Sequence, residues 1–251
     1  MDVTIPIGPI ELSGYLARPE GRRSRPALVI CHGFPSAPGG GANSVVSYPQ
    51  LADRIARELE WMVLTFSFRG CSPSQGQFSL QGWLDDVLAA VRFARRQDAS
   101  GVWVAGFGTG GALAVCATAA DPDICGAAAL AAPADFDDWA RHPDRLLRHS
   151  REVEVITDPE FPGDRDRWAA QLKSVRAVAC AEVMADRDLL VVHGNDDENV
   201  PVFDARVLAD AHSAAELRIV PGARHQLRHD PRAVALLLGW LDRRVAPVRD
   251  S

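Results

Sequence analysis

A dense cluster of glycines between an apolar segment and an alanine-rich one constrains the fold of this chain more than any other feature. Residues 102–111 read V-W-V-A-G-F-G-T-G-G, and residues 112–120 continue with mostly small apolar side chains. The apolar run predicts a buried strand, and the alanine-rich stretch predicts a helix. Glycine allows positive φ and close approach of neighbouring segments, so the cluster predicts a tight strand-to-helix turn.

The rest of the chain alternates between strand-like and helix-like patterns. We expect strands at residues 3–7, 11–17, 27–31, 62–66, 102–105, 124–131, 189–193 and 216–220, and helices at residues 48–60, 80–95, 112–120, 202–212 and 233–244. Strands that alternate with helices form βαβ units and a parallel sheet, and the first two strands read as an antiparallel edge. We therefore expect one α/β domain over residues 1–251, with about eight strands in a mostly parallel sheet and helices on both faces.

One segment interrupts this alternation. Residues 136–186 are polar, contain three prolines and hold the tryptophans Trp139 and Trp168. We interpret the segment as a small cap of short helices, inserted above the carboxyl ends of the strands.

Composition narrows the function classes. The 251 residues are 47% hydrophobic and 24% charged, which is typical of globular proteins. A net charge of −6 disfavours nucleic acid and anionic membranes as partners. We find no long uncharged apolar run and no basic leader, so we expect neither a membrane span nor a signal peptide and infer a cytoplasmic location. We expect no cofactor, and the sequence is compatible with a homodimer.

The five cysteines are scattered, and no two of them form a C-x-x-C pair. An odd number without such a pair is typical of reduced, buried thiols in a cytoplasmic protein. Cys31 needs separate attention because it precedes a candidate loop. It lies at the end of a predicted strand, away from the glycine turn, so we do not expect it to be a nucleophile.

Further motifs surround the glycine turn in a defined order. They read H-G-F-P at residues 32–35, F-R-G at 68–70, H-G-N-D-D-E-N-V-P at 193–201 and G-A-R-H-Q at 222–226. With these motifs the chain resembles the α/β-hydrolase superfamily, closest to its serine-aminopeptidase and dienelactone-hydrolase-like branches. The resemblance runs from Leu28 to the C-terminal helix and is weakest in the cap. It implies the α/β-hydrolase fold.

In that superfamily the turn at residues 106–110 would read G-x-S-x-G, with serine as the nucleophile. Here the central position is Gly108, which has no side chain, so an acyl-enzyme cannot form there. Thr109 is a poor substitute, because the turn needs small residues two positions on either side of the nucleophile. For Thr109 one of those residues would be the bulky Phe107.

The resemblance implies roles for four further residues. Asp197 matches the catalytic acid and His225 the base, so that Asp197 would accept the Nδ1–H of His225 and leave Nε2 facing the pocket. Asp135, at another strand end, is the alternative acid. The backbone amides of Phe34 and Thr109 would form the oxyanion hole. Without the resemblance, Asp197 could be an exposed turn residue and His225 a core or capping histidine.

Two other patterns are weaker evidence for a functional site. His229 follows His225 by four residues, but we see no third ligand and expect no metal site. The glycine-rich residues 36–43 lack the G-K-[ST] ending of a phosphate-binding loop, so we interpret them as a connector.

Three functions fit these residues. We prefer a hydrolase-like protein that binds a small ester, lactone or acyl compound and whose acyl-enzyme activity is absent or atypical. In the second function His225 acts as a general base on a water or a carbon acid, which would give slow hydrolysis, lyase-type chemistry or proton transfer. The third function is a ligand-dependent interaction protein that uses the cap for docking.

Overall fold

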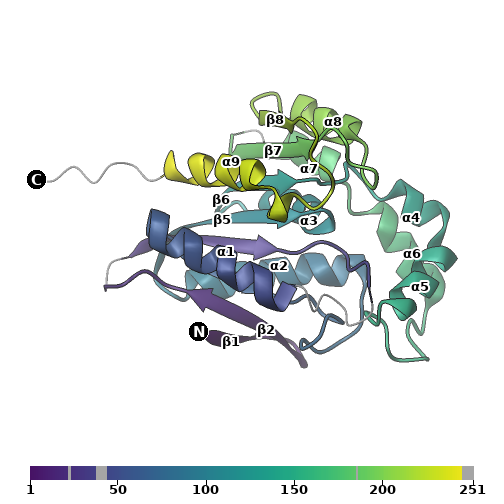
Figure 1. The fold of residues 1–251 in the computed structure, drawn as a ribbon. Coiled ribbons are helices and arrows are strands. Elements are labelled where there is room, and N and C mark those ends of the chain that lie inside the picture. Colours follow the sequence, from purple (N-terminus) through teal and green to yellow (C-terminus); the bar gives the residue numbers. More distant parts are fainter. Residues whose placement is uncertain (22–23, 38–43, 185, 245–251) are drawn as a thin grey trace, which may run out of the picture.

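The computed structural model describes residues 1–21, 24–37, 44–184 and 186–244. Residues 38–43 of the predicted connector lie outside this range. In the described chain the strands are β1 (Asp2–Ile7), β2 (Ile10–Ala17), β3 (Arg25–Cys31), β4 (Met62–Phe66), β5 (Ala99–Phe107), β6 (Ile124–Leu130), β7 (Asp188–Gly194) and β8 (Glu216–Val220). They form one sheet in the order β1-β2-β4-β3-β5-β6-β7-β8 (Figure 1).

The sheet is antiparallel only at its first edge. β1 pairs with β2 and β2 with β4 in antiparallel register, and each later neighbour is parallel. The central strands are almost continuously buried, as β3 and β6 show, because helices cover both of their faces. This arrangement confirms the predicted mostly parallel sheet.

Helices cover both faces of the sheet. They are α1 (Ser44–Leu59), α2 (Leu80–Arg95), α3 (Thr109–Ala120), α4 (Asp137–Arg141), α5 (Pro143–Glu152), α6 (Arg165–Ala170), α7 (Ala177–Val183), α8 (Val202–His212) and α9 (Pro231–Asp242), with short 3₁₀ turns at Gln171–Lys173 and Leu227–His229. Apolar side chains of α1 and α9 form one core with one face of the sheet, and those of α2, α3, α7 and α8 form a second core on the other face. No helix in the described ranges is long and apolar enough to cross a membrane.

The helices α4, α5 and α6 project beyond one end of the sheet (Figure 1). Trp168 of α6 is buried, and its indole Nε1 donates to the carbonyl of Phe78 at 3.2 Å, which ties this group to the loop before α2. The helix α7 also falls within residues 136–186, but it contacts α3 and α8 beside the sheet. The segment that the sequence treats as one cap therefore has two parts, of which only the first lies over the strand ends.

Candidate functional site

The turn between β5 and α3 is centred on Gly108. Its backbone has φ of 54° and ψ of −126°, a combination that is strained for residues with a side chain. The Gly108 amide donates to the carbonyl of Leu130 at 2.8 Å, and its own carbonyl accepts from the amide of Gly111 at 2.9 Å. The turn is therefore fixed to the neighbouring strand and to the first turn of the helix.

The glycines of this turn are needed for two different reasons. A β-carbon on Gly106 would overlap the carbonyl of Gly110, and one on Gly110 would overlap the carbonyl of His32. Gly108 differs, because the nearest atom to its β-carbon would be His225 Nε2 at 3.3 Å. Gly106 and Gly110 therefore permit close packing of β5, α3 and the end of β3, whereas a β-carbon on Gly108 would make a tight contact with the His225 ring and overlap no backbone atom.

His225 lies in the loop between β8 and α9, and Asp197 lies in the loop after β7. The Nδ1 atom of His225 is 2.9 Å from Oδ2 of Asp197, and its Nε2 faces Gly108. Asp135, the alternative acid, accepts instead from the amide of Asp137 and lies 3.4 Å from the guanidinium of Arg176. Of the two predicted acids, the structure brings Asp197 to His225.

Four donors surround the Asp197 carboxylate. Its Oδ1 accepts from the amides of Asn199 and Val200, each at 2.9 Å, and its Oδ2 lies 3.3 Å from Nε2 of His193 in addition to the bond from His225. Burial opposes ionisation, but hydrogen bonds from His193, His225 and the two amides hold the pKa of Asp197 well below its usual value. The carboxylate is therefore ionised at neutral pH.

His193 was not among the residues that the sequence singled out. The available signal was its place directly before a glycine in the H-G-N-D motif, at the end of a buried strand. A histidine at the carboxyl end of a parallel strand lies on the same edge of the sheet as the residues of the neighbouring loops.

The amides of Phe34 and Thr109 have no hydrogen-bond acceptor within the described residues. Thr109 is the first residue of α3, so its N–H lies at the positive end of the helix dipole. Both residues line the pocket that contains Gly108 and His225. Two unpaired amides beside Gly108 are suited to stabilise a negatively charged oxygen.

His32 of the H-G-F-P motif has a structural role beside the site. Nδ1 of His32 donates to the carbonyl of Gly33 at 2.7 Å, and Nε2 accepts from the amide of Phe68 at 3.1 Å. Burial lowers the pKa of His32 to about 4, so the ring is neutral. His32 thus links the loop after β3 to the loop after β4.

The F-R-G motif is also structural. The backbone amide and guanidinium of Arg69 donate to the fully buried carboxylate of Asp86 on α2, at 2.6 to 2.9 Å. Burial raises the pKa of Asp86 to about 6 although these donors favour its ionised form. Arg69 therefore anchors the loop after β4 to α2 and does not line the pocket.

The pocket over Gly108 has a volume of about 450 Å³. Its lining comprises Phe34, Gly108, Thr109, Pro133, Asp135, Phe136, Asp138, Trp139, Arg141, Asn199, Val200, Pro201, Asp204 and His225. The rings of Phe34 and Phe136 lie 5.2 and 5.0 Å from the ring of Trp139, so one wall is aromatic. A cavity of this size and composition is suited to a small molecule with an apolar body.

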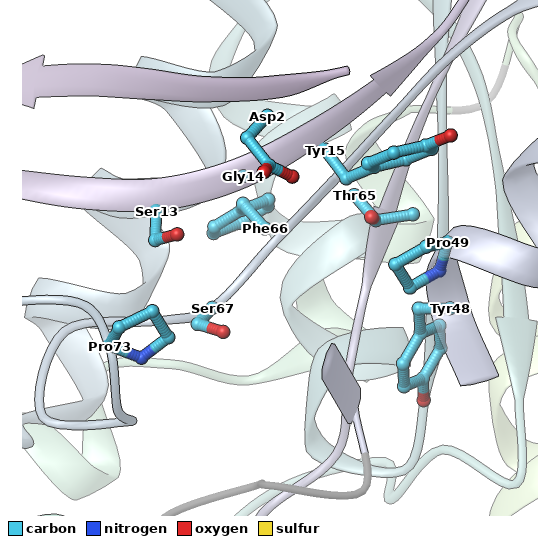
Figure 2. A pocket seen from close by; sticks show the side chains of 10 residues that line it. All are labelled: Asp2, Ser13, Gly14, Tyr15, Tyr48, Pro49, Thr65, Phe66, Ser67 and Pro73. Atoms are coloured by element: carbon cyan, nitrogen blue, oxygen red, sulfur yellow. The ribbon is translucent and has the colours of Figure 1, made fainter. Parts of the chain in front are cut away.

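A second hollow, of about 70 Å³, is lined by residues of β1, β2, β4, α1 and the loop after β4 (Figure 2). Its lining includes Ser13, Tyr15, Thr65 and Ser67. Figure 2 shows the hydroxyl of Tyr48 directed away from Tyr15 and Thr65. The space admits only a few water molecules, and neither His225 nor Asp197 borders it.

The remaining candidate residues, Cys31 and His229, lie apart from the Asp197–His225 pair. Cys31 is fully buried at the end of β3, and burial raises the pKa of its thiol far above the usual value. His229 is exposed in the turn after His225. In the part of the chain that the structure describes, no three His, Cys, Asp or Glu side chains are grouped so that they could hold a metal ion.

The sequence model of the prolyl oligopeptidase family matches residues 80–247, about two thirds of the chain. The motifs predict the serine-aminopeptidase and dienelactone-hydrolase-like branches of the superfamily, whereas the matching model is that of the prolyl oligopeptidase family. No curated protein matches the chain.

Several solved structures share the fold. Est1E from Butyrivibrio proteoclasticus with bound ferulic acid aligns with a TM-score of 0.75 and 22% identity over 96% of both chains. The esterase Pf2001 from Pyrococcus furiosus aligns with a TM-score of 0.70 and 18% identity, over 97% of this chain and 91% of the esterase. The mouse alpha/beta hydrolase domain-containing protein 10 gives a TM-score of 0.70 and 16% identity over 97% of both chains. These likenesses confirm the α/β-hydrolase fold that the motifs predict.

Proposed function

Because the chain belongs to the prolyl oligopeptidase family, we propose that it is a hydrolase-like protein that binds a small ester, lactone or acyl compound without forming an acyl-enzyme. Gly108 carries this proposal. His225 Nε2 lies 3.3 Å from the point that a Gly108 β-carbon would occupy, yet no side-chain atom is there to attack a carbonyl. The base is in position, and the atom that it would activate is missing.

The pocket supports ligand binding by this site. A ligand carbonyl over Gly108 would find the unpaired amides of Phe34 and Thr109 as hydrogen-bond donors. The apolar body of the ligand would contact Phe136 and Trp139. The ferulic acid bound to Est1E supports an aromatic acyl group as the first ligand class to test.

A second function is favoured by the complete Asp197–His225 pair. With Nδ1 held at 2.9 Å from the carboxylate, Nε2 of His225 is free to accept a proton. The pocket that Gly108 and His225 line gives a water molecule access to Nε2 and to a bound carbonyl. Such a protein would hydrolyse esters slowly by general base catalysis, because the covalent route is absent.

The two functions are separated by one set of measurements. Incubation with a fluorophosphonate and with p-nitrophenyl acetate, followed by intact-mass spectrometry, should give no adduct. Binding of methyl ferulate is measured by calorimetry, and its hydrolysis is followed by chromatography in wild type and in His225→Ala. Saturable binding without product supports the first function, and slow product formation that His225→Ala abolishes supports the second. A stoichiometric covalent adduct on any residue would contradict both.

A further inference from the structure

His193 lies directly behind the Asp197–His225 pair and outside the pocket. Its side chain is 0% exposed, and its Nε2 atom is 3.0 Å from the carbonyl of Val200 and 3.3 Å from Oδ2 of Asp197. A carbonyl oxygen can only accept, so Nε2 of His193 carries the hydrogen. That hydrogen is directed at the Val200 carbonyl and lies close to Oδ2 of Asp197, with which it makes a longer, weaker contact.

The other ring nitrogen of His193, Nδ1, is buried and has no hydrogen-bond partner among the described residues. A hydrogen on Nδ1 would therefore be buried without an acceptor there, which is unfavourable. His193 thus donates through Nε2 alone, at the cost of one unsatisfied atom. An apolar side chain would avoid that cost. The contacts that Nε2 makes must therefore account for a histidine at this buried position.

His193 and His225 both contact the same carboxylate oxygen of Asp197. Oδ2 of Asp197 faces His225 at 2.9 Å and His193 at 3.3 Å, while Oδ1 is occupied by two backbone amides. Each donor draws on the same negative charge, so His225 interacts with only part of it. If His193 donated nothing, more of the charge would stabilise a protonated His225. Protonated His225 could not accept a proton or a hydrogen bond from a ligand.

We propose that His193 is a positioning residue that acts through Asp197, shares its charge and keeps Nε2 of His225 available as an acceptor. The inference rests on the Asp197–His225 pair of the proposed function and adds a third side chain to it. Other charged groups near this pair are Asp135, Asp138, Arg141 and Asp204, which line the same pocket, and Arg228, which follows His225 by three residues. None of them is changed in the test below.

The test measures the pKa of His225 by NMR titration of its imidazole in the ligand-free protein, with the resonance assigned from His225→Gln. His193→Leu removes the donor and should raise the pKa of His225 by roughly half a unit or more. The matched control is His212→Leu. His212 is also buried, with Nε2 2.8 Å from the carbonyl of Arg187, and its Nδ1 has no hydrogen-bond partner in the part of the chain that the structure describes. It should cost similar stability and leave the His225 titration unchanged.

A second pair of variants covers the case in which His193→Leu does not fold. The amide nitrogen of glutamine can reach the position of Nε2, whereas asparagine is too short. His193→Gln should therefore keep the wild-type titration of His225, and His193→Asn should raise its pKa. An unchanged or lowered pKa of His225 in folded His193→Leu or His193→Asn would overturn the inference.

Failure of the inference is distinguishable from failure of the proposed function. Asp197→Asn should lower the pKa of His225, because the neutral amide no longer stabilises the imidazolium. If Asp197→Asn changes the titration and His193→Leu does not, only the role of His193 is lost. If Asp197→Asn has no effect, the pair itself is absent in solution, and the inference fails together with the general-base function that depends on the pair.

Discussion

Nε2 of His225 lies 3.3 Å from the point that a β-carbon on Gly108 would occupy. β-Carbons on the neighbouring Gly106 and Gly110 would instead overlap carbonyl groups of the backbone. A side chain at Gly108 therefore needs only a shift of a few tenths of an ångström by the His225 ring, and it would lie next to that ring. A single substitution at Gly108 can therefore test whether the rest of the site is functional.

Gly108→Ser should create esterase activity. The new hydroxyl would lie within reach of His225 and beside the amides of Phe34 and Thr109, so p-nitrophenyl acetate hydrolysis should rise roughly 10- to 100-fold above wild type. The positive φ of Gly108 is unfavourable for serine, so the variant should lose about 1–3 kcal/mol in free energy of unfolding.

Two controls accompany this substitution. Gly108→Ala imposes the same backbone strain without a hydroxyl, so it should lose similar stability and gain no activity. Gly108→Ser combined with His225→Ala should return to the wild-type rate. A folded Gly108→Ser protein without any gain would show that the amides or the Asp197–His225 pair cannot support catalysis.

Gly106→Ala should destabilise the protein far more than the same change in a helix. Its β-carbon would overlap the Gly110 carbonyl, and neither backbone segment can move without separating β5 from α3. We expect a loss of about 3 kcal/mol, at the upper end of the usual cost of overpacking. Gly239→Ala in α9 is the control, since its β-carbon would meet only the flexible end of Arg243 at 3.8 Å. It should stabilise by about 0.5–1 kcal/mol. Urea unfolding measures both, and equal effects would contradict the close packing at Gly106.

Most of the fold follows from local patterns in the sequence. The bounds of α2, α8 and β8 agree with the predicted ones, because each is a regular apolar pattern between clear turn residues. β5 is longer than predicted, since its polar and small first residues are fixed by pairing with Arg25 and Pro26 of β3. Such pairing is a tertiary contact that periodicity does not reveal.

The helix α7, within residues 136–186, does not follow from a local pattern in the sequence. The prolines and charges of that segment hide α7, whose A-V-A-C-A-E-V sequence is short and belongs to the second core, beside α3 and α8. Asp197, His225 and Gly108 could be named as candidates because they occupy motif positions, and the structure places them next to one another. The contribution of His193 was not predictable, since a single buried histidine in a strand has no pattern that distinguishes a core residue from a hydrogen-bond donor.

Asp86→Ala should be severely destabilising. The carboxylate is fully buried and pairs with Arg69, so its removal leaves a largely buried guanidinium without its partner. Breaking such a pair costs about 3–5 kcal/mol. Asp85→Ala removes the exposed neighbour on the same helix and should change stability by less than about 0.5 kcal/mol. Thermal unfolding compares the two variants. Similar melting temperatures would show that Arg69 finds another acceptor.

Asp197→Asn should change how stability depends on pH. Hydrogen bonds lower the pKa of Asp197 in the folded state below its unfolded value of 3.8. The ionised carboxylate therefore stabilises the fold above that value, and the contribution is lost as pH falls toward the folded-state pKa. Wild type should exceed Asp197→Asn in free energy of unfolding at about pH 7, and the difference should shrink at about pH 3. Asp196→Asn is the control, because its exposed carboxylate has no side-chain partner among the described residues and should give a small, nearly constant difference. Urea unfolding at both pH values measures this difference. A difference that grows on acidification would mean that the folded state binds a proton at Asp197 more readily than the unfolded chain does. That result would contradict the hydrogen bonds that stabilise the ionised carboxylate in the folded state.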